Sequence, residues 1–143
     1  KINIIPDDKE FVKKNDDVSK RFNEVVKDKN IDVLIKESVP HIEKLKKYFN
    51  RPRPKRLAKG FGIKLKDIEL KSMKTPSYPS GHSTQAYLIS DYLKSKHPEK
   101  SKQLDKVAKD ICYSRNVAKA HYKSDSNFGK KLGLAMSKHI KEQ

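Results

Sequence analysis

Long apolar runs and cysteine are the two features that this sequence most clearly lacks. No apolar stretch approaches the roughly 20 residues that a bilayer-spanning helix needs, and no secretory hydrophobic segment begins the chain. We therefore expect a soluble protein. The first residue is Lys1 and not methionine, so the sequence leaves open whether a leader was removed. Cys112 is the only cysteine, which excludes an internal disulfide, and its apolar neighbours favour a small buried residue.

Acidic residues are few relative to basic ones. The chain has 34 Lys and Arg residues against 18 Asp and Glu residues, which gives a formal net charge of +16. A solvated basic surface is the plainest explanation, attraction of anionic substrates is a second, and binding to nucleic-acid backbones is a third. Because the lysines are spread along the chain and are dense only over residues 44–56, nucleic-acid binding is the least favoured, but it stays open.

The composition predicts one domain with a thin core. Hydrophobic residues make up 34% of the 143 residues and charged residues 36%. A chain of this length forms one domain and not two. Association of two copies would bury additional apolar surface, so a homo-oligomer is compatible with the composition.

Apolar residues recur at steps of three, four and seven, which is typical of amphipathic helices, and neither strand-like alternation nor an internal repeat occurs. The pattern predicts helices over residues 8–28, 31–50, 82–96, 99–120 and 127–141. Pro40 is expected to divide the second of these, with Ser38 as a cap, and Pro98 to open the fourth. The predicted fold class is all-α, a single-domain bundle of about five or six helices.

Residues 51–79 have the composition of an irregular segment. Four prolines and two glycines fall in this range, and a short turn or strand is expected within residues 61–70. Loops of this length in a compact domain are usually functional or mobile.

A proline, a hydroxyl, a glycine and a histidine follow one another at residues 79–82, directly before a helical pattern. Gly81 allows backbone N–H groups to approach an anion, and the helix N-terminus adds partial positive charge. Ser80 can add a hydroxyl donor, and His82 a proton donor that works near neutral pH. Considered alone, this segment is better explained by an ordinary turn with a helix cap, with His82 as a surface residue.

Two further blocks flank this turn. Upstream, Lys46 stands seven positions before Arg53, which a proline follows. Downstream, Arg115 stands six positions before His121, and Asp125 follows that histidine by four positions. A solvated helix end, an intrahelical ion pair or a helix cap would explain each of these residues singly.

Taken together and in this order, the three blocks resemble the type 2 phosphatidic acid phosphatase superfamily, which includes bacterial class A acid phosphatases and vanadium haloperoxidases. The resemblance covers residues 46–125 as a motif-bearing core, whereas residues 1–40 are expected to form N-terminal helices without a motif. It implies that residues 1–143 form one phosphatase-like helical bundle, with the site at the ends of the central helices.

Hydrolysis of a phosphate monoester needs cations around the phosphate oxygens, an in-line nucleophile and an acid for the leaving oxygen. The residues predicted to bind the phosphate are Lys46, Arg53, Ser80, Gly81 and Arg115, the arginines because their planar guanidinium pairs two oxygens at once. No metal or other cofactor is needed, and vanadate is expected to act as an inhibitor that mimics phosphate.

His121 is the predicted nucleophile, because Asp125 lies close enough in sequence to hold the other nitrogen of its ring. His82 has no carboxylate nearby in the sequence and is the predicted general acid. The resemblance implies the same division of roles, with a phosphohistidine at His121 that water then hydrolyses.

The first block is ambiguous, because Lys44 and Arg51 have the same spacing as Lys46 and Arg53. The second pair is preferred. Soluble acid phosphatases typically carry an extra arginine two places before the motif arginine, which is where Arg51 stands.

The resulting hypothesis is a metal-independent phosphoric monoester hydrolase of the acid phosphatase type, acting on a small phosphate ester. A vanadium-dependent haloperoxidase would use the same pocket, although those enzymes are usually far longer, and a non-catalytic anion-binding or nucleic-acid-binding protein is a further alternative. The sequence leaves the natural substrate open among lipid phosphates, nucleotides, sugar phosphates and diphosphates. Residues 55–78 and the N-terminal helices are expected to set specificity. The compartment is unknown from the sequence, and the resemblance implies a periplasmic or secreted protein.

Overall fold

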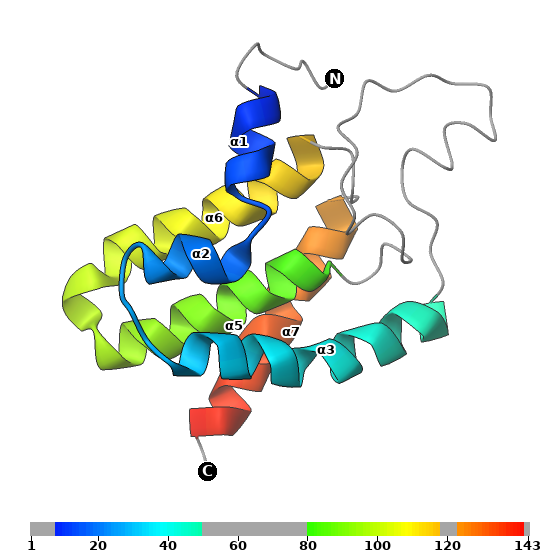
Figure 1. The fold of residues 1–143 in the computed structure, drawn as a ribbon. Coiled ribbons are helices and arrows are strands. Elements are labelled where there is room, and N and C mark those ends of the chain that lie inside the picture. The colour runs from blue at the N-terminus through cyan, green and yellow to red at the C-terminus, as the bar shows by residue number, and fades with distance from the viewer. Residues whose placement is uncertain (1–7, 50–79, 118–122, 142–143) are drawn as a thin grey trace.

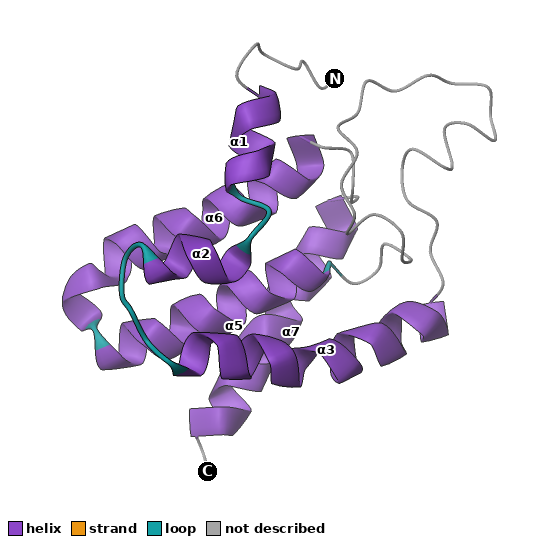
Figure 2. Ribbon diagram, viewed as in Figure 1, coloured by secondary structure: helices purple, strands orange, loops and turns teal. Residues whose placement is uncertain are grey.

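The computed structural model describes residues 8–49, 80–117 and 123–141. These residues form helices, turns and short connections, and no strand occurs among them (Figure 2). The helices are α1 (Asp8–Lys14), α2 (Val18–Asn23), α3 (Asn30–Phe49), α5 (Gly81–Lys96), α6 (Ser101–Val117) and α7 (Lys123–Lys141), with a 3-10 turn, η2 (Pro98–Lys100), before α6. The prediction of an all-α bundle of five or six helices is therefore confirmed.

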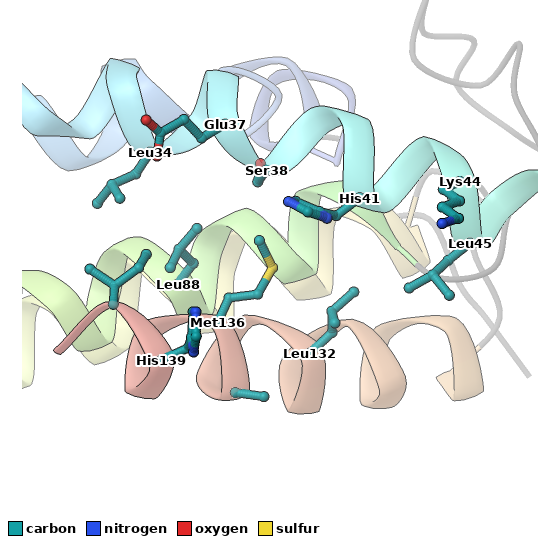
Figure 3. Close-up of a pocket in the computed structure, with 12 residues that line it drawn as sticks. Leu34, Glu37, Ser38, His41, Lys44, Leu45, Leu88, Leu132, Met136 and His139 are labelled. Carbon is teal, nitrogen blue, oxygen red and sulfur yellow. The ribbon is translucent and has the colours of Figure 1, made fainter. Parts of the chain in front are cut away.

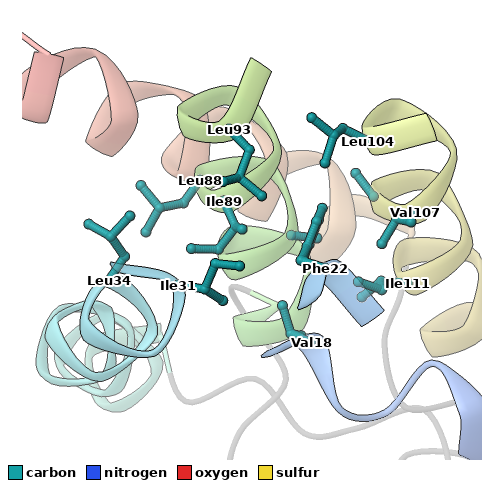
Figure 4. Close-up of a cluster of buried hydrophobic side chains, with 12 residues drawn as sticks. Val18, Phe22, Ile31, Leu34, Leu88, Ile89, Leu93, Leu104, Val107 and Ile111 are labelled. Carbon is teal, nitrogen blue, oxygen red and sulfur yellow. The ribbon is translucent and has the colours of Figure 1, made fainter. Parts of the chain in front are cut away.

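Helix α5 is the central element of the bundle. It contacts α2, α3, α6 and α7, and α7 runs along it most closely (Figure 1). The hydrophobic core lies where α2, α3, α5 and α6 meet (Figure 4). Its fully buried members include Phe22 from α2, Ile31 from α3, Ile89 from α5 and Ile111 from α6. Burial of these side chains fixes the position of α5 relative to the other helices.

Two glycines of α7 allow the close approach of α5. A Cβ atom at Gly129 would lie only 2.8 Å from the carbonyl oxygen of Ser80, and one at Gly133 only 2.9 Å from the backbone nitrogen of Leu88. Real Cβ atoms do not approach backbone atoms so closely, so only glycine fits at these positions. The backbones consequently pack side by side, and the start of α7 comes beside the start of α5.

The segment predicted as one helix over residues 8–28 is divided in the structure, and its helical part ends at Asn23. The Asn15 amide donates to the Phe11 carbonyl (2.9 Å), which closes the end of α1. Asp17 then caps α2 by accepting from the backbone N–H of Lys20 (3.0 Å). Local side-chain hydrogen bonds thus end one helix and begin another, although the apolar period continues through the break.

The expected division at Pro40 is wrong, because α3 continues through it. Pro40 is exposed, and the carbonyl that loses its helical N–H partner belongs to Lys36, which is also exposed, so water can take that place. Ser38 is not a cap. It is buried within the helix, and its hydroxyl donates to the carbonyl of Ile35 (2.6 Å).

Three further boundaries can be compared with the structure. Helix α5 ends at Lys96 as predicted, and Pro98 opens the 3-10 turn from which α6 follows at Ser101. Helix α7 begins at Lys123, four residues before the expected start, so Asp125 lies in its first turn rather than before it. The predictions for residues 51–79 and for the end of the fourth helix beyond residue 117 lie outside the described residues.

Candidate active site

The ends of four helices lie on the same side of the bundle (Figure 1). They are the C-terminal turns of α3 and α6 and the N-terminal turns of α5 and α7. Six of the eight residues predicted for the site are among the described residues, namely Lys46, Ser80, Gly81, His82, Arg115 and Asp125. Arg53 and His121 lie outside them. The six come from three separate sequence blocks, and all of them are on these four helix ends.

Ser80 connects α5 with α7. Its side chain caps α5 by accepting from the backbone N–H of Ser83 (3.1 Å), and its own N–H donates to the carbonyl of Asp125 (3.1 Å). As an acceptor in the cap, the hydroxyl keeps its hydrogen for donation to a further oxygen. The N–H groups of Gly81 and His82 belong to the first turn of α5, where the helix offers no carbonyl to them and the dipole favours an anion.

Lys46 lies against this helix start. It is 5% exposed although it carries an ammonium group, and its Cε lies 4.0 Å from the place of a Cβ at Gly81. Lys44, the alternative member of the first block, is exposed on another side of α3. Of the two candidate lysines, only Lys46 thus lies against the start of α5; Arg51 and Arg53 lie outside the described residues.

Arg115 and Asp125 are both fully buried, with 0% of their surface exposed. Buried charged side chains are uncommon unless they are paired or hydrogen-bonded. Arg115 donates from Nη1 to the carboxylate Oδ1 of Asp16 (3.0 Å). This arginine therefore does not pair with Asp110, the partner that a purely structural interpretation would favour; Asp110 instead accepts from Arg21 (3.3 Å).

Asp16 also contacts the predicted general acid. Nε2 of His82 lies 2.8 Å from the backbone carbonyl of Asp16 and 3.2 Å from its Oδ1. Both neighbours are acceptors, so Nε2 carries the hydrogen in this arrangement. Sequence reasoning missed Asp16, which is 66 positions before His82 and 99 before Arg115, because no local pattern joins residues so far apart.

The surroundings of His82 lower its pKa below the ordinary value of 6.5. Burial is the main cause, because it penalises the charged ring, and the positive charge of Arg115 adds to the effect. The hydrogen bonds and the negative charge of Asp16 act in the opposite direction but do not reverse the shift. A second negative charge beside Arg115 would offset the effect of this arginine and favour the protonated ring of His82.

A separate groove of about 710 Å³ lies between α3 and α7 (Figure 3). Its walls are mainly apolar, with Leu88 from α5 at the base, and they also carry His41 and His139. None of the six described site residues lines this groove. The hollow is therefore distinct from the cluster of helix ends.

Two classes of feature were not found in the part of the chain that the structure describes. No three His, Cys, Asp or Glu side chains come together there in a way that could hold a metal ion. None of the described helices is both long enough and apolar enough to cross a bilayer.

Comparison with known proteins agrees with the motif content. The family model of the PAP2 superfamily matches residues 33–143, a range that includes all eight predicted site residues but not Asp16. Non-specific acid phosphatases of Salmonella typhimurium and Salmonella typhi are each 33% identical to this chain over 88 residues. That alignment covers 62% of this chain and 35% of each relative, so the chain matches only about a third of the length of these relatives.

Proposed function

The chain belongs to the PAP2 superfamily, and from this premise we propose that it is a metal-independent phosphatase that hydrolyses phosphate monoesters through a phosphohistidine intermediate. The observation that carries the proposal is the convergence of Lys46, the α5 N-terminus and Arg115 at one side of the bundle. These groups supply the positive charge and the N–H donors that a phosphate requires.

The proposed binding mode follows from these positions. The phosphate oxygens accept from the N–H groups of Gly81 and His82, from the Ser80 hydroxyl and from the cationic side chains of Lys46 and Arg115. Arg53 would complete the cationic set. A buried arginine is well suited to this role, because its planar fork is held by the surrounding side chains before the ligand arrives.

The chemical steps balance with the two histidines and one water. A ring nitrogen of His121 attacks phosphorus, the bond to the ester oxygen breaks, and His82 gives its proton to the leaving oxygen. Neutral His82 then takes a proton from water as that water attacks the phosphohistidine, which releases inorganic phosphate and restores both rings. Asp125 accepts from the other nitrogen of His121 and stabilises its positive charge.

The negative charge of a bound substrate would favour the protonated form of His82. The pKa of this ring is lowered by burial and by Arg115, which favours the neutral form. A phosphate dianion beside Arg115 offsets that positive charge and raises the pKa of the ring. Protonation of the acid is thereby coupled to the presence of the group on which it acts.

The decisive experiment is hydrolysis of an aryl phosphate in excess chelator, with rapid alkaline quenching to trap a phosphorylated histidine, because the P–N bond is stable in alkali and labile in acid. We expect turnover that vanadate inhibits and a phosphate label on His121.

Asp125→Asn should retain the fold and lower kcat by roughly 10²–10⁴-fold, because an amide stabilises the ring cation poorly. The exposed His41, replaced by alanine, provides a control that should keep full activity. Unchanged turnover in His121→Ala would refute the role of this residue.

A further inference from the structure

Asp16 belongs to none of the sequence blocks and lies outside residues 33–143, which match the family model. It is located in the short connection between α1 and α2, next to the fully buried Arg115. We propose that Asp16 is an internal competitor for the phosphate site: its carboxylate and the substrate phosphate occupy the same donors of Arg115 and His82 in turn. This inference rests on the function proposed above and adds a residue that limits access to that site.

The donors contacted by Asp16 are those that a phosphate would use. Oδ1 lies 3.0 Å from Nη1 of Arg115 and 3.2 Å from Nε2 of His82. A carboxylate oxygen and a phosphate oxygen are equivalent acceptors for guanidinium and imidazolium groups, at similar distances. A phosphate oxygen placed on these two nitrogens would therefore lie where Oδ1 now lies.

Occupation of both positions at once is unfavourable for two reasons. Nε2 of His82 carries a single hydrogen, and Asp16 already presents its carbonyl oxygen at 2.8 Å and its carboxylate at 3.2 Å to that nitrogen. A further oxygen at this hydrogen, from the phosphate ester, would have to displace the carboxylate. In addition, a phosphate dianion next to the carboxylate would be repelled by it in a poorly solvated site.

The two partners differ in their freedom to move. The Arg115 side chain is 1% exposed, whereas that of Asp16 is 35% exposed. The backbone on either side of Asp16 is held in place: the Asn15 side chain bonds to Phe11 and to Arg21 (2.9 and 2.8 Å), and Asp17 caps α2. Rotation of the Asp16 side chain toward solvent is thus the smallest change that frees Nη1 of Arg115 and removes the carboxylate from Nε2 of His82, which keeps its contact with the Asp16 carbonyl.

The charge of Arg115 explains why the competitor is an anion. A buried guanidinium without a counter-charge is strongly disfavoured, so Asp16 stabilises the protein until a phosphate takes over this role. Removal of the carboxylate should consequently make phosphate binding more favourable, since the phosphate no longer displaces an ion pair.

The test is titration of inorganic phosphate into the full chain by calorimetry at constant ionic strength, for the wild type, Asp16→Asn and the control Asp17→Asn. Both variants remove one negative charge, but Asp17 is exposed, caps α2 and contacts neither Arg115 nor His82, and asparagine caps helices equally well. We expect the Kd for phosphate to fall about tenfold in Asp16→Asn and to change less than about twofold in Asp17→Asn. The concentration of vanadate that inhibits hydrolysis should likewise fall in Asp16→Asn and change little in Asp17→Asn.

A second test uses only the wild-type chain and therefore does not require Asp16→Asn to fold. Carbodiimide labelling of carboxylates, read by mass spectrometry, should become several-fold faster at Asp16 when phosphate is added and stay constant at Asp17. Equal or weaker phosphate binding by folded Asp16→Asn, or protection of Asp16 by phosphate, would overturn the inference and leave the proposed function intact. Failure of both the wild type and Asp16→Asn to bind phosphate would overturn both.

Discussion

His82 has to be protonated to act as an acid, yet its surroundings favour the neutral ring. Burial and Arg115 lower its pKa below 6.5, and Asp16 only partly offsets them. The free enzyme therefore loses this proton on the acid side of the ordinary histidine value. In the proposed substrate complex the phosphate charge would raise the pKa of the ring, so its proton would be held to a higher pH than in the free protein.

We expect the pH profiles of kcat/KM and kcat to differ accordingly. The profile of kcat/KM reports the free enzyme, so its alkaline limb should begin below pH 6.5, whereas the limb of kcat should lie at higher pH. Both profiles can be measured with an aryl phosphate whose leaving group needs protonation. A dinitrophenyl phosphate, whose leaving group departs without a proton, should lose the alkaline limb of kcat. An alkaline limb of kcat/KM well above neutral pH would contradict the lowered pKa.

The sequence predicted residues that the structure places at neighbouring helix ends, but it did not predict all of their contacts. Short-range spacing identified Ser80, Gly81 and His82, because these residues act through the local geometry of a turn before a helix. The order of the three motif blocks along the chain then grouped these residues with Lys46 and Arg115. Asp16 could not be found in this way, since its contacts depend on how α1 packs against α6 and not on any local pattern.

At the scale of elements, the apolar period located the helices better than their ends. The period predicted α5 and most of α3, yet it missed the break at residues 15–17 and placed the start of α7 four residues late. Side-chain hydrogen bonds decide these boundaries, as the cap at Asp17 shows. The rule that proline divides a helix failed at Pro40, where both the proline and Lys36, whose carbonyl loses its helical partner, are exposed residues.

The contact between α5 and α7 supports a prediction about stability. Gly133→Ala should lower the free energy of unfolding by about 1–3 kcal/mol, because the added methyl group meets the backbone of Thr84 and Leu88 and the helices must separate. Urea denaturation followed by circular dichroism measures the change. Since the same contact places the start of α7 beside Ser80, activity should also fall at temperatures where the variant is folded.

A second glycine provides the matched control for this measurement. A Cβ at Gly81 would lie 3.5 Å from Cγ2 of Ile42, which is an ordinary contact, so Gly81→Ala should keep the stability of the wild type or raise it slightly. If the two substitutions had equal effects on unfolding, loss of glycine in general and not the approach of α5 and α7 would explain the result.

At the scale of the whole molecule, the net charge of +16 sets the field that an anionic substrate meets. Much of this charge is on exposed lysines, whereas Lys46 is buried at the helix ends of the site. Surface charges act over about a Debye length, roughly 8 Å at physiological ionic strength, and they influence the rate of encounter more than the bound state. Added salt should therefore weaken the contribution of the surface lysines to kcat/KM and leave the contribution of Lys46 largely unchanged.

Replacement of the exposed Lys102, Lys109 and Lys131 by glutamine separates these two contributions, since it lowers the net charge by three without touching the site. At low ionic strength kcat/KM for an aryl phosphate should fall by about twofold, because fewer charges attract the dianion, and kcat should not change. Above roughly 0.5 M salt the variant and the wild type should converge, since surface charges are then screened. Lys46→Gln should instead lower kcat/KM at every salt concentration. If the triple variant kept its deficit at high salt, the exposed lysines would contribute to the folded site itself and not to a long-range field.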